Sequence, residues 1–146
     1  MPRLLRLLSM PVGDRKMLIR AGVLLWIVRL GLWILPFQRL RDLLSKKNHK
    51  PIAETTTELA SMQRIARSVR RMSRYVPAAT CLAQSLVTVK LLEDAGFPAR
   101  LRIGVARSES GELEAHAWVE SNGRVIIGGT HADLKRFTVL HAVEGT

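Results

Sequence analysis

The chain has 146 residues, with 23 Lys and Arg against 12 Asp and Glu, a formal net charge of +11, and a single cysteine. One cysteine excludes an intramolecular disulfide and any zinc site built from several cysteines. A content of 47% hydrophobic residues excludes a disordered chain. The length favours a single globular core. No metal or cofactor is expected.

The positive charge is concentrated in the first third of the chain. Residues 1–50 carry 11 Lys and Arg against 2 Asp, whereas residues 51–146 carry 12 against 10 Asp and Glu. A polar run from Lys46 to Pro51 separates the two parts. We therefore expect a basic, apolar helical segment over 1–50 and a nearly charge-balanced domain over 51–146.

Residues 17–38 are apolar enough to suggest a membrane span, but Arg20 and Arg29 interrupt the run. The pattern instead predicts an amphipathic helix that does not cross a membrane. Its apolar face could pack on the rest of the chain, dock on a partner protein, or lie on an anionic membrane surface, and the sequence does not separate these. The predicted apolar face contains Leu24, Ile27, Val28, Leu32 and Leu35.

A second helix is predicted over residues 55–75, and it carries a cluster of arginines. Clustered arginines can bind the phosphate groups of a nucleic acid, but no zinc-finger spacing, aromatic-interleaved motif or recognition helix accompanies this cluster. Nucleic acid is therefore not an expected partner. The clustered residues are Arg64, Arg67, Arg70, Arg71 and Arg74, and the opposite, core-facing side has Ile65, Ala66, Val69 and Met72.

After Pro77 the local signals predict a helix, a strand and a hairpin. Thr80 is a good N-cap, which places Cys81 at the first helical position, and Gly96 ends this helix. Alternating residues predict strands over 99–105 and 113–120, and Asn122-Gly123 favours a type I′ turn into a third strand over 124–128.

The lone cysteine and one histidine indicate nucleophilic catalysis. A thiol in the first turn of a helix faces unpaired N–H groups and the positive end of the helix dipole, which stabilise a thiolate and a developing oxyanion. His116 is the only histidine predicted inside a regular element, on a strand that must pack close to this helix. Cys81 and His116 are therefore the candidate nucleophile and general base.

A third, orienting residue is harder to find. The turn register pairs His116 with Gly129, where an acid would be expected, but the sequence there is Gly128-Gly129. Asp133 is the nearest acid on that side. Three alternatives stay open: Asp133 folds back, a backbone carbonyl or water holds the imidazole, or the site works as a dyad.

These residues resemble a known family, the lasso peptide biosynthesis B2 proteins, which are stand-alone leader peptidases. The resemblance covers nearly the whole chain and implies an α+β fold with a transglutaminase-like or papain-like cysteine protease core, in which the cysteine helix packs on a small antiparallel sheet after N-terminal helices. The runs that carry it are Cys81-Leu-Ala-Gln-Ser-Leu, Ala99-Arg-Leu-Arg-Ile-Gly-Val, Glu114-Ala-His-Ala-Trp-Val-Glu and Gly123-Arg-Val-Ile-Ile-Gly-Gly.

The resemblance implies that Cys81 attacks the peptide bond at the leader/core junction of a ribosomally made precursor and that His116 acts as base. Gln84 is a candidate oxyanion donor, the alternative being an ordinary polar helix residue. Trp118 is a candidate for shielding the ion pair or lining the substrate groove, the alternative being a core or rim aromatic.

The implied partners are the precursor peptide, a separate leader-recognition protein of the B1 type and an ATP-dependent lasso cyclase. We expect the protein to be cytoplasmic, either free in the cytoplasm or bound at the membrane surface. Two other functions stay open: an acyltransferase of the same fold, in which an amine resolves the thioester, and a non-catalytic scaffold that docks on a partner or membrane through its N-terminal third.

Overall fold

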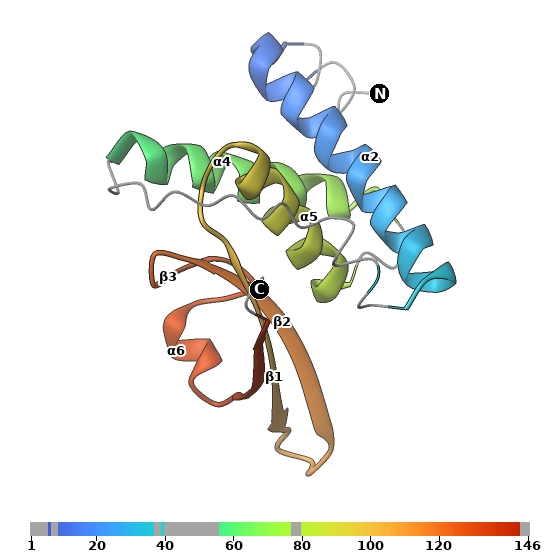
Figure 1. The fold of residues 1–146 in the computed structure, drawn as a ribbon, viewed down its shortest axis with the longest axis vertical. Coiled ribbons are helices and arrows are strands. Elements are labelled where there is room, and N and C mark those ends of the chain that lie inside the picture. Colours follow the sequence, from blue (N-terminus) through green and yellow to red (C-terminus); the bar gives the residue numbers. More distant parts are fainter. Residues whose placement is uncertain (1–5, 7–8, 37–38, 40–55, 77–79, 144–146) are drawn as a thin grey trace.

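The computed structural model describes residues 6, 9–36, 39, 56–76 and 80–143, without the side chains of residues 141–143 (Figure 1). Within this part of the chain, helices α4 (Thr56–Ser73) and α5 (Cys81–Asp94) pack on a four-stranded sheet, and helix α2 (Val12–Ile34) packs on both of these helices. The expected α+β fold with a preceding N-terminal helix is confirmed.

The sheet is antiparallel, with strand order β3-β2-β1-β4. Its strands are β1 (Arg100–Arg107), β2 (Leu113–Ser121), β3 (Arg124–Ile127) and β4 (Thr138–Val143). The short helix α6 (His131–Leu134) lies in the connection between β3 and β4. Neither α6 nor β4 was predicted, so the expectation that only His116 lies in a regular element is wrong: His131 begins α6 and His141 lies in β4.

The β2–β3 hairpin turns at Asn122 and Gly123, whose φ angles of 50° and 78° fit the predicted type I′ turn. Ser121 pairs with Arg124 as predicted. A bulge then shifts the register, so that Val119 pairs with Ile127, and β3 ends there. The predicted pairing of His116 with Gly129 is therefore wrong, because one extra residue enters β3.

The two faces of the sheet have different partners. Ala117 and Val119 of β2 pair with Ile103 and Leu101 of β1. Three of these residues belong to the core that the helices share, and Ile103 packs against it. Alternate residues of a strand point to opposite faces. His116 and its neighbour Trp118 therefore lie on the face away from this core, where their rings contact Phe137 from the α6–β4 connection.

Helix α2 contributes to the same core as α4 and α5. It begins after Pro11 and ends before Pro36, because a residue that precedes proline disfavours the helical conformation. The predicted apolar face needs correction, since Ile27 is 51% exposed. The buried side of α2 consists of Leu18, Ala21, Gly22, Leu25 and Val28.

Helix α2 is also long and apolar enough to cross a membrane, with a mean hydropathy of 1.8 in its most apolar stretch, of which 28% is buried. Length and composition alone do not distinguish a span from a core helix. The predicted boundary between residues 50 and 51 lies outside the described residues.

Candidate active site

Cys81 occupies the predicted place at the start of a helix. Thr80 is the N-cap of α5, and its hydroxyl oxygen accepts a hydrogen bond from Ala83 N at 3.3 Å. Cys81 is the first helical residue, is half-buried, and packs against the common core. Its thiol therefore lies beside the N–H groups of the first turn, which have no partner within the helix.

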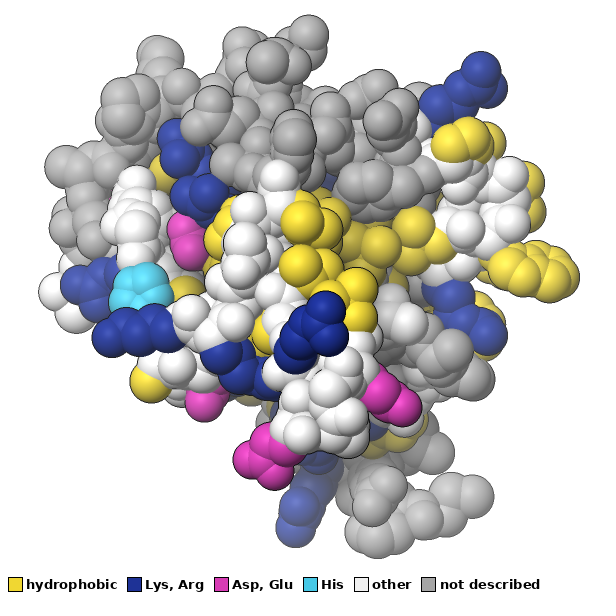
Figure 2. All heavy atoms as spheres, turned by 90° about the horizontal axis from the view of Figure 1, so that it is seen from below, with side chains coloured by type: hydrophobic (Ala, Val, Ile, Leu, Met, Phe, Trp, Pro, Cys, Tyr) yellow, Lys and Arg dark blue, Asp and Glu magenta, His cyan; other side chains and the backbone are white. Residues whose placement is uncertain are grey.

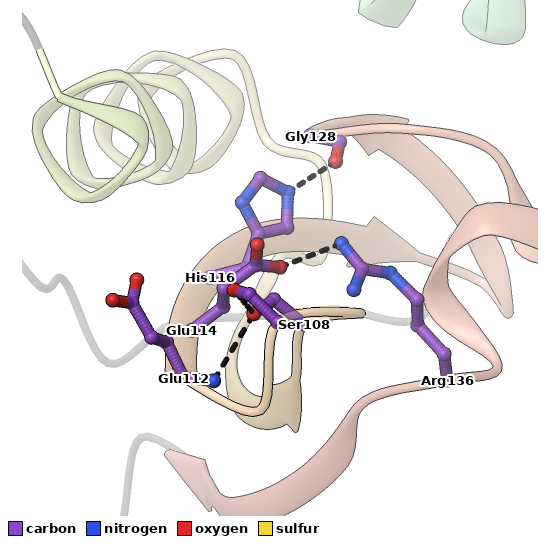
Figure 3. A network of polar contacts seen from close by, with 7 residues as sticks. Ser108, Glu112, Glu114, His116, Gly128 and Arg136 are labelled. Carbon is purple, nitrogen blue, oxygen red and sulfur yellow. Dashed lines mark hydrogen bonds and ion pairs between the residues drawn. The ribbon is translucent and has the colours of Figure 1, made fainter.

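His116 is held by a backbone carbonyl. Its Nε2 atom lies 2.5 Å from the oxygen of Gly128, the residue after β3 (Figure 3). A carbonyl oxygen only accepts, so Nε2 carries the proton and donates it. In the neutral ring Nδ1 is then the basic nitrogen, which is the form that a general base requires.

Gly128 occupies a position that no other residue fits. Its φ angle is 109°, which L residues rarely adopt, and an added Cβ would lie 2.8 Å from Cα of Trp118. The backbone of residue 128 therefore approaches β2 too closely for an aspartate side chain. The carbonyl takes the place where the sequence suggested an acid.

Asp133 makes its hydrogen bonds elsewhere. Its carboxylate accepts from the hydroxyl of Thr130 at 2.6 Å and from the backbone N–H of Thr130 at 3.2 Å, which completes the capping box of α6. The Thr130 hydroxyl, and after it the backbone N–H, lower the pKa of Asp133 below its ordinary value. Of the three alternatives for the imidazole, the geometry favours the backbone carbonyl.

Cys81 and His116 approach the same strand from different sides. Helix α5 packs on β2, as expected. Cys81, however, contacts the core face, whereas His116 points to the face that carries Trp118. Within the described part of the chain no hydrogen bond joins their side chains. The structure thus brings the two elements together without closing the catalytic pair.

The candidates Gln84 and Trp118 lie in different environments. Gln84 lies one turn after Cys81 on α5, and its backbone oxygen accepts from the hydroxyl of Thr88 at 2.7 Å. Trp118 is only 3% exposed, and its Nε1 donates to Glu120 at 3.0 Å. This burial favours a structural role for Trp118, as an aromatic packed beside Phe137 on the face away from the shared core, with its ring centroid 6.2 Å from that of His116.

Three residues beside His116 were missed by the sequence patterns. Phe137 lies 5.4 Å from the imidazole between ring centroids, and Arg136 pairs with Glu114 at 2.9 Å (Figure 3). Glu114 shares the strand face of His116, a signal that the period of two contained. Phe137 and Arg136 lie in an irregular connection, for which periodicity gives no signal.

The described residues contain no group of three or more His, Cys, Asp and Glu side chains that could hold a metal ion. What the arrangement offers chemically is a helix-start thiol and an oriented imidazole on an adjacent strand. Cysteine-dependent acyl transfer uses these two groups, a thiol nucleophile and an imidazole base.

The chain belongs to the transglutaminase-like superfamily, whose family model matches residues 23–142. Proteins of this superfamily are typically cysteine hydrolases or transferases. The match begins inside α2 and ends in β4, so it includes the second half of α2 and all the other elements that form the common core. No curated protein and no solved structure matches the chain.

Proposed function

We propose that the protein is a cysteine peptidase that removes the leader from a ribosomally made lasso peptide precursor, with Cys81 as nucleophile and His116 as base. The observation that carries the proposal is the position of Cys81 at the first residue of a capped helix in a transglutaminase-like chain. The hydrogen bond that fixes His116 supports it. The lasso assignment rests on the motif resemblance around both residues.

In the proposed reaction, Nδ1 of His116 takes the proton from Cys81, and the thiolate attacks the carbonyl carbon at the leader/core junction. N–H groups in the first turn of α5 hold the oxyanion. The C–N bond breaks as His116 gives its proton to the departing amine, which leaves the leader as a thioester. Water then attacks the thioester, and its proton returns through His116 to the sulfur.

This scheme requires the imidazole and the thiol to meet in the substrate complex. Catalytic hydrogen bonds are often long in a free enzyme and tighten only when substrate binds. The pairing of β2 with β3 stops at Val119, so the β2 edge beside His116 has no β3 partner within the described residues. In the proposal, an extended peptide binds along β2 beyond the point where the Gly128 backbone closes against Ala117 and Trp118.

The proposal also includes the partners and the location of the protein. The precursor peptide is the substrate, a separate B1-type leader-recognition protein presents it, and an ATP-dependent cyclase closes the ring afterwards. The protein works in the cytoplasm, and α2 rests on an anionic membrane surface. Its exposed apolar side chains and basic residues support that contact.

A second candidate function is acyl transfer to an amine. The transglutaminase-like fold is compatible with both hydrolysis and transfer. The two reactions share the thioester and differ only in the group that resolves it. The product therefore separates them: a free carboxylate on the leader after hydrolysis, and an amide after transfer.

The test is incubation of precursor and recognition protein with wild type, Cys81→Ala and His116→Ala, read by mass spectrometry. We expect Cys81→Ala to abolish leader removal and His116→Ala to slow it by about 10²–10⁴-fold. Added methylamine distinguishes water from an amine as the resolving group.

Circular dichroism of each variant checks that the fold is intact. Undiminished leader removal by folded Cys81→Ala would end the peptidase proposal and the transferase alternative together.

A further inference from the structure

A groove of ≈ 560 Å³ runs between α4 and the segment that follows the β2–β3 turn. One wall is formed by Arg67 and Arg70 from α4, and the other by Arg124 from β3 and His131 at the start of α6. Among the described residues that line it, none is Asp or Glu. The groove therefore presents positive charge from two opposite sides.

One of these basic side chains joins the two walls of the groove. Arg70 donates a hydrogen bond to the backbone oxygen of Ile126 at 3.2 Å, which ties α4 to β3 across the groove. Arg67, Arg124 and His131 are exposed. Figure 2 shows Lys and Arg side chains next to a histidine on one face of the molecule. Guanidinium groups in this arrangement suit carboxylates, which they bind with paired hydrogen bonds.

The groove adjoins the candidate active site. Gly129 and Thr130 form part of its lining, and the carbonyl of the preceding residue, Gly128, holds His116. One residue of chain thus separates the groove from the group that orients the imidazole. A peptide bound near His116 would reach the groove with the residues that flank its scissile bond.

We propose that this groove binds an acidic stretch of the peptide substrate. The inference rests on the proposed function, because it assigns the substrate of the same site. A peptide fits better than a nucleic acid, because the groove floor is aliphatic, from Leu59, Ala66 and Val125, and its described lining contains no Phe, Trp or Tyr. Single-stranded nucleic acids are usually bound by aromatic side chains on which bases stack.

The test measures binding without catalysis, in the Cys81→Ala background. The probe is fluorescein-labelled Gly-Asp-Glu-Asp-Glu-Gly, and the neutral comparison is Gly-Asn-Gln-Asn-Gln-Gly, both followed by fluorescence anisotropy. We expect the acidic peptide alone to bind, and Arg67→Glu and Arg124→Glu each to weaken it about tenfold. Arg67→Lys should weaken binding less than Arg67→Glu does, because it keeps the charge and loses only the paired hydrogen bonds.

The matched control is Arg107→Glu, which makes the same change in net charge at the opposite end of the β1–β2 pair. It should leave binding unchanged. The inference is overturned if Arg107→Glu weakens binding as much as Arg67→Glu, if the neutral peptide binds equally well, or if a six-nucleotide oligo-dT displaces the peptide at a lower concentration than unlabelled peptide does.

The two proposals fail separately in this design. Groove-dependent binding without leader removal by wild type would leave the groove inference standing and reject the peptidase. If wild type removes the leader but Arg67→Glu binds the acidic peptide as tightly as the Cys81→Ala parent does, the peptidase proposal stands and the groove inference is rejected.

Discussion

The group that accepts the hydrogen bond of His116, the Gly128 carbonyl, is neutral. The Gly128 carbonyl fixes the ring orientation and the tautomer, as a carboxylate would, but it adds no negative charge beside an imidazolium. A site of this kind orients its base by backbone geometry. Changes in the Gly128 backbone should therefore affect the site as strongly as a change in a side chain.

Gly128→Ala tests this dependence. Its Cβ would lie 2.5 Å from the Cβ of Trp118, in a backbone conformation with φ of 109°. We expect a loss of about 3 kcal/mol in the free energy of unfolding, measured by urea denaturation. Gly129→Ala, whose Cβ finds ordinary contacts at 3.7 Å or more, should lose only about 1 kcal/mol from its own positive φ. Equal losses would contradict the close approach to Trp118.

Asp133→Asn addresses the open question of the acid, and the role of Asp133 as orienting acid stays a prediction until it is measured. Because the carboxylate bonds to Thr130 and Gly128 holds the imidazole, we expect leader removal to be unchanged. A large loss of rate with an intact fold would instead make Asp133 the orienting acid.

The same variant should change the pH dependence of stability. Hydrogen bonds from Thr130 lower the folded-state pKa of Asp133 below 3.8, so its stabilising effect is present above 3.8 and is lost as the pH falls through the lowered value. Wild type should therefore melt at a higher temperature than Asp133→Asn at neutral pH, and the difference should vanish in strong acid. Differential scanning calorimetry across this range checks it.

At the scale of elements, α2 has two different apolar sides. One packs in the core, and the other exposes large side chains, some of which gather at the right-hand edge of Figure 2. A contiguous patch of exposed apolar side chains on one side of a helix commonly marks an interaction surface. It consists of Ile19, Val23, Trp26, Ile27, Leu30, Trp33 and Ile34.

Basic residues accompany this patch. Arg29 lies over the ring of Trp26 at 5.7 Å, and Arg20 pairs with Asp94 of α5. Tryptophan and arginine together suit the boundary between lipid headgroups and acyl chains. This combination supports the proposed contact with an anionic membrane surface.

Trp33→Glu should weaken that contact. Trp33 is 89% exposed, so the change should leave the fold intact while reducing binding to vesicles of phosphatidylglycerol and phosphatidylcholine by about tenfold, measured by co-sedimentation. Leu113→Glu, at a 72% exposed position on β2, is the matched control and should bind as wild type does. Equal binding by wild type and Trp33→Glu would argue against lipid.

Elements with strong local signals were predictable from the sequence. Thr80 and Gly96 bracket α5, and Asn122-Gly123 fixes the hairpin turn, because caps and turns depend on the backbone preferences of single residues. Strand β4 was missed, because six residues with little alternation resemble a loop until β1 offers an edge to pair with. The bulge after Val119 was missed for a similar reason, since it reflects packing between strands.

The sequence predicted one part of the candidate site, the place of Cys81, but not the group that holds His116. The place of Cys81 follows from its cap, so the sequence was sufficient. The anchor of His116 is a carbonyl, and every residue has one, so no side-chain pattern could indicate Gly128. The face of β2 that His116 occupies depends on which side the helices cover, which is a tertiary property.

At the scale of the whole molecule, one core joins the N-terminal helix to the rest of the domain. Leu25 is fully buried among residues of α4 and α5, whereas Leu30 of the same helix is 51% exposed. Leu25→Ala should therefore lower the free energy of unfolding by about 2–5 kcal/mol. Leu30→Ala should stay within about 0.5 kcal/mol of wild type in urea denaturation. Equal, small effects would mean that α2 is a docking segment outside the core.

The short pairing of β3 has a consequence for the motions of the site. Only Val119, Glu120 and Ser121 pair with β3, and Gly128 follows that strand directly. Amides in so small a unit open by local fluctuations that leave the rest of the fold closed. Each such opening also removes the anchor of the imidazole. The fraction of time in which His116 is free to turn is therefore determined by the local opening of β3, and not by the global stability of the protein.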